Sequence, residues 1–315
     1  MTIVLMLAGG RARAAGLPDV QAVSLAAPAL PLSATASGFS ASPVLSSNGQ
    51  FVAFVSQANN LTPNDAAGNA RGRWLNVFVR NLASNQTTLV SVTPDGTTTG
   101  NDDSYSAGLS ADGRFLVFES RASNLVTNDT NGVSDIFVRD LEAGVTKLVS
   151  GNASGAGSGD GASSNPSITP DGRYVVFESA ADDLVPNDTN GIPDIFVRDL
   201  QTGTTILVST NAQVSSVGGG ESDSPVITPD GRWVAFVSTA ANLVAGVTNT
   251  QGDVYARDLA TGTTYWVSTN AAAIARSSTT NVMRFLSSMN PVISNDGQYA
   301  AYTCTPGSAT TTLVL

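Results

Sequence analysis

Two polar stretches of this chain carry side chains whose types and spacing suit a bound metal cation. Each stretch reads Asn-Asp-Thr-Asn-Gly, and an aspartate follows the glycine after two further residues. The oxygen-bearing side chains therefore stand at positions i, i+2 and i+6, with a glycine at the bend. Calcium is bound in proteins by about six to eight oxygens of this kind. The candidate calcium ligands are Asp129, Asn131, Asp135, Asp188, Asn190 and Asp194.

The spacing of these ligands is similar to the first half of an EF-hand loop, in which side chains and carbonyls wrap the ion. The glutamate that ends such a loop is absent, so water or a neighbouring loop would have to complete the coordination. A second interpretation is a repeated turn, because Asn and Asp tolerate left-handed backbone and bond their own main chain. Both interpretations stay open. The first and fourth units contain incomplete copies of this pattern, with Asp65, Asn69, Arg71 and Arg73 in the first and Asn249 in the fourth. The pattern therefore predicts two cation sites at most.

The composition excludes several classes of site. The 315 residues include no histidine and a single cysteine, Cys304. Nucleophile pairs that use histidine, thiolate zinc sites and intrachain disulfides are therefore ruled out. The formal net charge of −10 disfavours nucleic acid and anionic membrane surfaces, which need clustered Lys and Arg. No apolar run approaches about 18 residues, so membrane insertion is not expected.

The two stretches belong to a longer unit that occurs five times. Its clearest marker is a tight Asp-Gly or Asn-Gly turn, followed by an aromatic residue and an apolar run. Successive turns lie between 59 and 66 residues apart. A period of this length built from strands indicates a radial or solenoidal architecture. The five markers are Asn48–Phe54, Asp112–Phe118, Asp171–Phe177, Asp230–Phe236 and Asp296–Tyr302.

Each unit divides into four strand-like runs rich in β-branched and aromatic residues. In the third unit the runs are Pro166–Thr169, Arg173–Ser179, Asp194–Arg198 and Thr204–Ser209. The middle runs are apolar at successive positions, which indicates a sheet that is covered on both faces. Four-stranded sheets repeated in this way are the blades of a β-propeller. The chain is therefore expected to be all-β, with four-stranded blades.

The repeat resembles a known family. Ser/Thr-x-Asp-Gly-Arg before aromatic-Val-x-Phe, and later Asp-Ile-Phe-Val-Arg-Asp-Leu, are similar to the WD40-like propeller repeat of the TolB family, over residues 42 to 302. The resemblance implies a β-propeller; in that family the propeller has six blades, lies in the periplasm and contacts other envelope proteins. This chain has five markers and no N-terminal α/β domain, so only the repeat is carried over.

The ends of the chain suggest how the propeller is bounded. Residues 1–16 resemble a secretory signal peptide without its basic region, and residues 17–41 read as a linker. The propeller is predicted over residues 42–315, and the fifth unit lacks a clear fourth strand. Residues 20–26 match the outer-strand pattern and are predicted to close a five-bladed ring, hiding its open edges. The alternative is a clipped part of a larger propeller. The predicted repeats are 42–92, 105–150, 165–210, 224–269 and 290–315.

Other repeated polar side chains are predicted to support the blades. Glu119 and Glu178 occupy one strand position in adjacent units. Paired carboxylates can cleave glycosides, but their repetition favours a role in the scaffold. The aromatic residue after each turn is expected to pack between blades. The recurring Arg-Asp pairs are expected to form a salt bridge or a turn contact within each blade; they are Arg139-Asp140, Arg198-Asp199 and Arg257-Asp258.

These patterns predict a non-catalytic, exported β-propeller, periplasmic or extracellular, that acts as a binding scaffold. The loops between second and third strands are expected to share a face with the loops between units. That acidic rim would suit a protein partner or bridging calcium. Two alternatives remain: a propeller-type carbohydrate-active enzyme, a glycosidase or a lyase, or a fragment of a larger surface protein. Carboxylates at the channel mouth that break the repeat would favour the enzyme.

Overall fold

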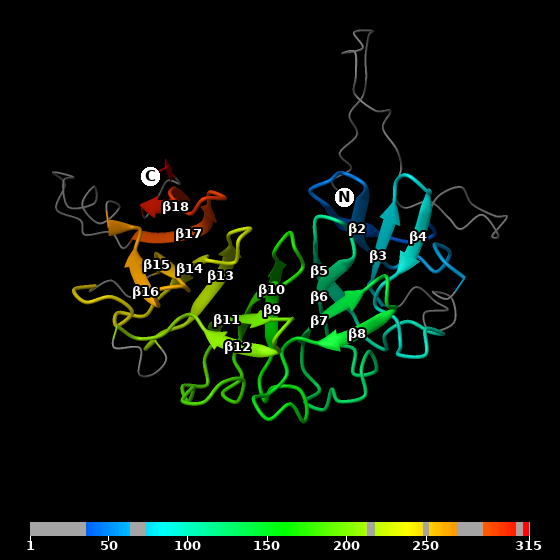
Figure 1. Ribbon diagram of the computed structural model, residues 1–315, viewed down its shortest axis with the longest axis horizontal. Coiled ribbons are helices and arrows are strands. Elements are labelled where there is room, and N and C mark those ends of the chain that lie inside the picture. The colour runs from blue at the N-terminus through cyan, green and yellow to red at the C-terminus, as the bar shows by residue number, and fades with distance from the viewer. Residues whose placement is uncertain are drawn as a thin grey trace, which may run out of the picture.

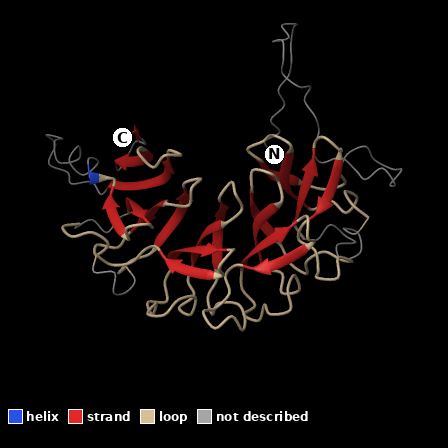
Figure 2. Cartoon of the chain, viewed as in Figure 1, coloured by secondary structure: helices blue, strands red, loops and turns tan. Residues whose placement is uncertain are grey.

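The computed structural model describes residues 36–63, 74–212, 218–247, 252–269, 286–306 and 311–314. Their strands form five antiparallel sheets that follow one another along an arc (Figure 1). Figure 2 shows the strands in red and the loops that join them in tan. The first and fifth sheets lie at the two ends of the arc, on either side of its open side. The prediction of an all-β fold built from repeated sheets is confirmed.

Each of the first four sheets has its four strands side by side in sequence order. The first sheet contains β1 (Ser40–Leu45), β2 (Phe51–Ser56), β3 (Asn76–Asn81) and β4 (Gln86–Leu89). The second contains β5 (Ser104–Leu109), β6 (Phe115–Ser120), β7 (Asp135–Asp140) and β8 (Val145–Leu148). The third contains β9 (Ser163–Ile168), β10 (Tyr174–Ser179), β11 (Asp194–Asp199) and β12 (Thr204–Leu207). The fourth contains β13 (Ser222–Ile227), β14 (Trp233–Ser238), β15 (Asp253–Asp258) and β16 (Thr263–Trp266). The described strands of the fifth are β17 (Leu286–Ile293), β18 (Ala300–Pro306) and β19 (Thr311–Val314).

A recurring turn joins the first two strands of each sheet. In the third sheet, Asp171 Oδ1 accepts hydrogen bonds from Thr169 Oγ1 at 2.5 Å and from the main-chain N–H of Arg173 at 3.0 Å. Gly172 follows with a φ of +75°, which favours glycine over residues that carry a Cβ. The same hydroxyl-to-aspartate bond holds the turns at Asp112, Asp230 and Asp296.

The turn glycine also receives the aromatic residue of the preceding sheet. A Cβ built on Gly172 would overlap the ring of Phe115, so the ring lies directly on the glycine backbone. We call this the aromatic–glycine contact. The predicted packing of the repeated aromatic position between sheets is confirmed for the first four sheets, whereas Tyr299 of the fifth is 63% exposed. The other instances are Phe51 on Gly113, Tyr174 on Gly231 and Trp233 on Gly297.

Buried clusters between neighbouring sheets form the hydrophobic core. Between the first and second sheets, Ala53 and Val79 pack against Leu116 and Phe118, and all four are almost fully buried. Equivalent clusters join the second sheet to the third and the third to the fourth. Burial of each large apolar side chain contributes about 1.5–3 kcal/mol. Each sheet therefore depends on its neighbours for most of its core.

The first strand of the third sheet begins earlier than the sequence predicted. Strand β9 begins at Ser163, three residues before the predicted start at Pro166. The pairing of β9 with β10 shifts register between Val176 and Glu178, and Asn165 has a φ of +52°. This irregularity is a β-bulge, where a proline can lie within a strand because no ladder hydrogen bond is required of it. The same positive φ precedes a proline at Ser42, Ser224 and Asn290.

The predicted closing strand, residues 20–26, lies outside the described residues. The number of blades in the complete protein and the closure of a ring therefore stay predictions. The predicted leader at residues 1–16 also lies outside the described part. Within the described residues, no helix is both long and apolar enough to cross a membrane.

Candidate cation sites

The predicted calcium ligands lie where the second strand of a sheet loops over to the third. Asp135 is the first residue of β7, and Asp194 is the first residue of β11. Asp129 and Asp188 lie in the loops that lead into these strands, and all four side chains are buried. At each site the charge of one aspartate acts on the pKa of the other, so the structure places the two carboxylates near one another. We call them the second-sheet pair, Asp129 with Asp135, and the third-sheet pair, Asp188 with Asp194.

A serine just after the fourth strand fixes one oxygen of the deeper aspartate in each pair. Ser150 Oγ donates to Asp135 Oδ1, and Ser209 Oγ donates to Asp194 Oδ1, both at 2.5 Å. Each serine oxygen in turn accepts the main-chain N–H of the residue after the aspartate, at 3.0 Å. The hydroxyl proton is thus committed to the carboxylate, and the aspartate side chain is held in one orientation.

Three carboxylate oxygens of the two pairs are buried and have no hydrogen-bond partner: Asp129 Oδ1, Asp135 Oδ2 and Asp188 Oδ1. An ionised carboxylate that is removed from water without a partner is costly. These three oxygens are therefore the atoms of the two pairs that are free to accept a further partner.

The pKa values of all four aspartates are raised, with burial as the largest cause in each case. Burial, followed by the charge of Asp194, raises the pKa of Asp188 to about 7. Burial also raises the pKa of Asp135 to about 7, against the opposing hydrogen bond from Ser150 and with a contribution from Asp129. Burial raises the pKa of Asp194 to about 6 and that of Asp129 above its usual range. The two carboxylates of a pair therefore bind and release protons as a coupled unit, near neutral pH.

The two predicted asparagine ligands present their amide groups differently from the expectation. Asn190 Nδ2 donates to Asp194 Oδ2 at 2.8 Å, while Asn190 Oδ1 accepts the main-chain N–H of Ile192 at 3.2 Å. Asn131 Oδ1 likewise accepts from the N–H of Val133 at 3.0 Å. These are the turn bonds of the alternative interpretation. The asparagine side-chain oxygens are thus bonded to the main chain of their own loops. The oxygens without a hydrogen-bond partner belong to the aspartates.

The third-sheet site has more negative charge around it than the sequence pattern indicated. The charges of Asp182 and Asp160 both act on Asp188. Asp182 Oδ1 accepts the N–H of Gly191 at 2.8 Å, and Asp160 Oδ1 accepts the N–H of Asp182 at 2.8 Å. The second sheet has Ser123 in the place of Asp182. The signal missed was the Asp182-Asp183 dipeptide, which breaks the repeat.

The first and fourth sheets provide natural comparisons. In the fourth, Asp253 is buried and accepts from Ser268 Oγ at 2.6 Å, and its Oδ2 is also unpaired. The place of the second aspartate is taken there by Val247, which is buried in the core. In the first sheet, the neutral Asn76 replaces the deeper aspartate and accepts from Ser91 Oγ at 3.0 Å. Within the described parts of these loops, the second and third sheets are the ones that carry a pair.

Each candidate site is a pair of carboxylates and not a larger cluster. Among the described residues, no group of three or more histidine, cysteine, aspartate or glutamate side chains is placed to hold a metal ion. Main-chain carbonyls and water would therefore supply the remaining oxygens of a calcium ion. The degenerate first copy around Asp65 and Asn249 of the fourth lie outside the described residues.

The loops that carry the pairs lie beside the loops between sheets, as the sequence predicted. The N–H of Ala153 donates to the carbonyl of Asp183 at 2.8 Å, and the N–H of Asp160 donates to Asp183 Oδ1 at 3.0 Å. Asn131 Nδ2 donates to the carbonyl of Gly159 at 2.8 Å. Both kinds of loop therefore form one connected rim.

The aspartate of each repeated Arg-Asp dipeptide forms an ion pair, but its partner is an arginine of the preceding turn and not the adjacent arginine of the dipeptide. Asp199 pairs with Arg173 of the preceding turn, with Nη2 and Oδ2 2.8 Å apart. Arg198 instead donates to Thr205 Oγ1 at 2.8 Å. The second and fourth sheets repeat the ion pair with Arg114–Asp140 and Arg232–Asp258. Each pair ties the first hairpin of a sheet to its third strand.

Replacement of Asp258 by Asn is expected to lower the free energy of unfolding by about 1 kcal/mol, because the partly exposed pair with Arg232 is lost. Urea unfolding at neutral pH measures this loss, which should shrink at high salt. The matched control is Asn81→Asp in the first sheet, where Gln50 stands in the arginine position. That control should gain nothing. An equal loss at all salt concentrations would contradict an ionic contribution.

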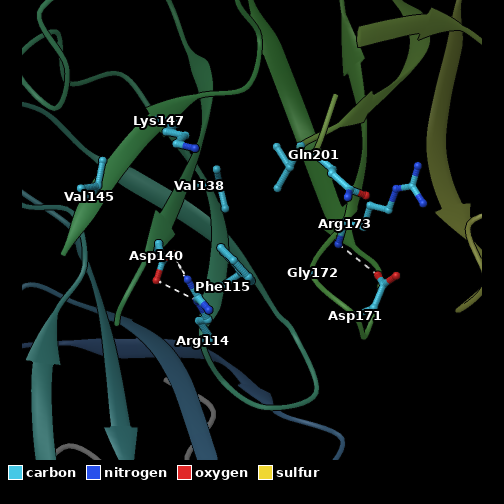
Figure 3. A pocket seen from close by; sticks show the side chains of 11 residues that line it. Arg114, Phe115, Val138, Asp140, Val145, Lys147, Asp171, Gly172, Arg173 and Gln201 are labelled. Atoms are coloured by element: carbon cyan, nitrogen blue, oxygen red, sulfur yellow. Dashed lines mark hydrogen bonds and ion pairs between the residues drawn. The ribbon is translucent and has the colours of Figure 1, made fainter. Parts of the chain in front are cut away.

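A pocket of about 560 Å³ opens between the second and third sheets near these ion pairs. Figure 3 shows Asp140 against Arg114, and Asp171 against the main chain of Arg173. Asp140 forms an ion pair with Arg114, and Asp171 Oδ1 accepts hydrogen bonds from Thr169 and Arg173 of its own turn.

Glu119 and Glu178 also have partners. Ser134 Oγ donates to Glu119 Oε1 at 2.8 Å, and Asn165 Nδ2 donates to Glu178 Oε2 at 2.9 Å. Burial raises the pKa of Glu178, and the charges of Asp223 and Glu119 add to the effect. Asp223 is an acidic residue that breaks the repeat at this end of the sheets. The enzyme alternative stays a prediction.

Comparison with known proteins supports the fold and no specific activity. No protein-family model and no curated protein matches the sequence. A solved structure from Agrobacterium tumefaciens described as TolB is 16% identical, with a TM-score of 0.48, and the match covers 87% of this chain and 73% of that one. A prolyl endopeptidase is 11% identical with a TM-score of 0.51 over 88% of this chain, which spans 33% of that protein. The β-propeller domain of a protease from Pyrococcus furiosus is 13% identical, with a TM-score of 0.43 over 88% of this chain and 71% of that one. The predicted TolB-like β-propeller repeat is confirmed as a fold.

Proposed function

We propose that this chain is a non-catalytic β-propeller scaffold, exported to the periplasm or the cell exterior, whose loop rim binds calcium and a protein partner. The calcium sites are the second-sheet pair and the third-sheet pair. The observation that carries the proposal is the set of buried, unpaired oxygens on Asp129, Asp135 and Asp188. A cation between the paired carboxylates would satisfy these oxygens and offset the cost of their burial.

Calcium suits these pairs better than magnesium or zinc. The free ligands are oxygens only, and the described residues place no histidine or thiolate near them. Calcium accepts irregular sets of carboxylate, carbonyl and water oxygens, whereas magnesium requires a near-ideal octahedron. The extra charges of Asp160 and Asp182 support tighter binding at the third-sheet pair than at the second-sheet pair.

Calorimetric titration of the chelator-treated protein with calcium tests the proposal. We expect two calcium ions per chain, with tighter binding at the third-sheet pair. Asp188→Val should remove the tighter site, because valine already takes this place in the fourth sheet as Val247. Asp129→Val should remove the weaker site, and the double variant should bind no calcium.

The matched control is Glu142→Gln, which removes one negative charge at an exposed position whose side chain forms an ion pair with Arg114. This variant should keep both sites, so a general effect of net charge can be separated from loss of ligands. The absence of calcium binding to the unsubstituted protein, with no change in melting temperature on addition of chelator, would exclude the cation proposal.

The rim is proposed as the docking surface for a basic protein partner. Its support is the dense acidic character of the connected loops, which include Asp160, Asp182 and Asp183, in a chain with a net charge of −10. Binding of a fluorescent oligolysine peptide should weaken with salt and with Asp160→Asn. Equal binding to that variant would place the acidic docking surface elsewhere.

A further inference from the structure

A groove lies beside β8, the last strand of the second sheet, where that sheet meets the third. It is the pocket of about 560 Å³ described above, and we call it the Lys147 groove. Its lining includes Phe115 of β6, Val145 and Lys147 of β8, and Leu200 and Gln201 of the third sheet. The volume lies within the range of about 300–1,000 Å³ that is typical of small-molecule sites.

The groove between the first and second sheets shows what the fold itself requires. It is smaller, with a volume of about 280 Å³, although the same aromatic–glycine contact lies beside it. At the repeat positions of Val145, Lys147 and Gln201 this smaller groove has Gln86, Thr88 and Glu142. Neighbouring sheets therefore pack with either set of side chains. The requirements of packing do not account for the valine, for the lysine or for the loss of an acidic residue.

Lys147 is the cationic side chain of this groove that lacks an acidic partner. It is the only lysine in the sequence, and no carboxylate of the described residues lies within ion-pair distance of its ammonium group. The two arginines of the lining are engaged, Arg114 by Asp140 and Arg173 by Asp199. Figure 3 shows the ammonium end of Lys147 turned toward the third sheet. One positive charge is thus available inside the groove.

The same groove offers apolar surface beside this charge. Val145 is 47% exposed, and Phe115 is half-buried, with its ring against Gly172. Val145 and Lys147 stand two positions apart on β8, so their side chains project from the same face of the sheet. Asp171, the remaining carboxylate of the lining, is exposed at its turn, where Oδ1 accepts two hydrogen bonds. Apolar surface with one free cation fits a ligand that carries a negative charge at one end.

We propose that the Lys147 groove binds a small carboxylic acid with an apolar body. The carboxylate accepts a hydrogen bond from the Lys147 ammonium group, and the apolar body lies on Phe115 and Val145. A hydrogen bond between two ionised groups is stronger than one between neutral groups, and removal of the apolar body from water adds to the affinity. The groove lies at the beginning of β10, whereas the loop of the third-sheet pair follows the end of that strand. This site is therefore independent of the calcium proposal.

Isotope-labelled reductive methylation tests the site directly, because one lysine gives one side-chain signal in the NMR spectrum and keeps its positive charge. The loss of this signal in Lys147→Thr identifies it. Titration with 4-phenylbutyrate should shift the signal and reach saturation. The uncharged 4-phenylbutanamide, and acetate, which lacks an apolar body, should leave it almost unchanged. The absence of a shift, an equal shift with either control compound, or a shift that never saturates would overturn the proposal, since the last result would mean simple ion pairing of an exposed lysine.

Equilibrium dialysis of 4-phenylbutyrate against the unmodified protein measures what each side chain contributes. Lys147→Thr introduces the residue that the first sheet has at this position, so the variant should fold and should bind at least about tenfold more weakly. Val145→Gln, which copies Gln86, should bind about threefold more weakly. The matched control Arg121→Gln removes an exposed positive charge just after β6 and should keep the full affinity. Full affinity in Lys147→Thr, or an equal loss in Arg121→Gln, would place the ligand elsewhere and overturn the proposal.

Discussion

Between about pH 4.5 and 7.5 in the presence of chelator, the free energy of unfolding is expected to fall as the pH rises. The folded-state pKa is about 7 for Asp135 and Asp188 and about 6 for Asp194, all above the ordinary value of 3.8. The folded protein therefore binds more protons than the unfolded chain in this range. Stability must then decrease with pH. The loss should be on the order of 2–4 kcal/mol per pair, since the two members of a pair titrate together.

Other carboxylates limit this effect to the stated range. Asp199 and Asp258 have pKa values of about 2, which arise first from their hydrogen bonds with Arg173 and Arg232. Their contribution is fully present above the ordinary pKa and is lost only as the pH falls below about 4. The bare protein should therefore be most stable near pH 4–5. Glu178 and Asp183, whose pKa values burial also raises, act in the same direction as the pairs.

Calcium should reverse the trend. The ion binds the ionised carboxylates, so saturating calcium should raise the melting temperature at neutral pH far more than at pH 5. Thermal unfolding at several pH values, with calcium or with chelator, measures both effects. The double variant Asp129→Val, Asp188→Val should lose all of the calcium effect and the part of the pH dependence that Asp129 and Asp188 contribute, whereas the part due to the burial of Asp135 and Asp194 should remain. Stability that rises steadily from pH 5 to 8 in chelator would contradict the burial of ionisable pairs.

Gly172→Ala is expected to destabilise the protein by about 3–4 kcal/mol. About 1–2 kcal/mol arises because alanine is unfavourable at a φ of +75°. A similar amount, about 1–3 kcal/mol, arises because the new methyl group overlaps the ring of Phe115 and must push the second sheet away. Equilibrium unfolding in urea measures the sum.

The control for this substitution exists in the same chain. Gly49→Ala has a nearly identical φ of +71° and no atom within 4 Å of the added methyl group. It should cost only the backbone part, about 1–2 kcal/mol. In a Phe115→Ala background, Gly172→Ala should approach the same smaller cost, which a double-mutant cycle would show. Equal losses for the two glycine substitutions in the unsubstituted protein would mean that the ring does not fix the distance between sheets.

The strands could be predicted because each unit repeats the same chemistry. In the third sheet, β10 and β11 begin within one residue of their predicted starts at Arg173 and Asp194. The predicted start of β9 at Pro166 is wrong by three residues, because the bulge at Asn165 admits the proline into the strand. Alternation of residue types does not reveal a bulge, whose extra residue belongs to neither face.

The candidate sites were predicted in part. The spacing located Asp188 and Asp194 and predicted their proximity. It could not show that Asn190 Oδ1 is used by the main chain, because that depends on the turn conformation. Nor could it show that Asp160, from the loop between sheets, adds its charge to this site. Proximity between loops of different sheets is set by packing and has no period in the sequence.

The aromatic–glycine contact has a consequence for how such a chain can change its length. The contact always runs from the aromatic residue of one repeat to the glycine of the next. Duplication or loss of one whole repeat therefore leaves every remaining ring opposite a glycine. Exchange of residues within one repeat, in contrast, needs a matching change in its neighbour. The sequence can thus gain or lose entire blades without placing a ring opposite a residue other than glycine. Each contact between sheets, however, depends on residues from two successive repeats.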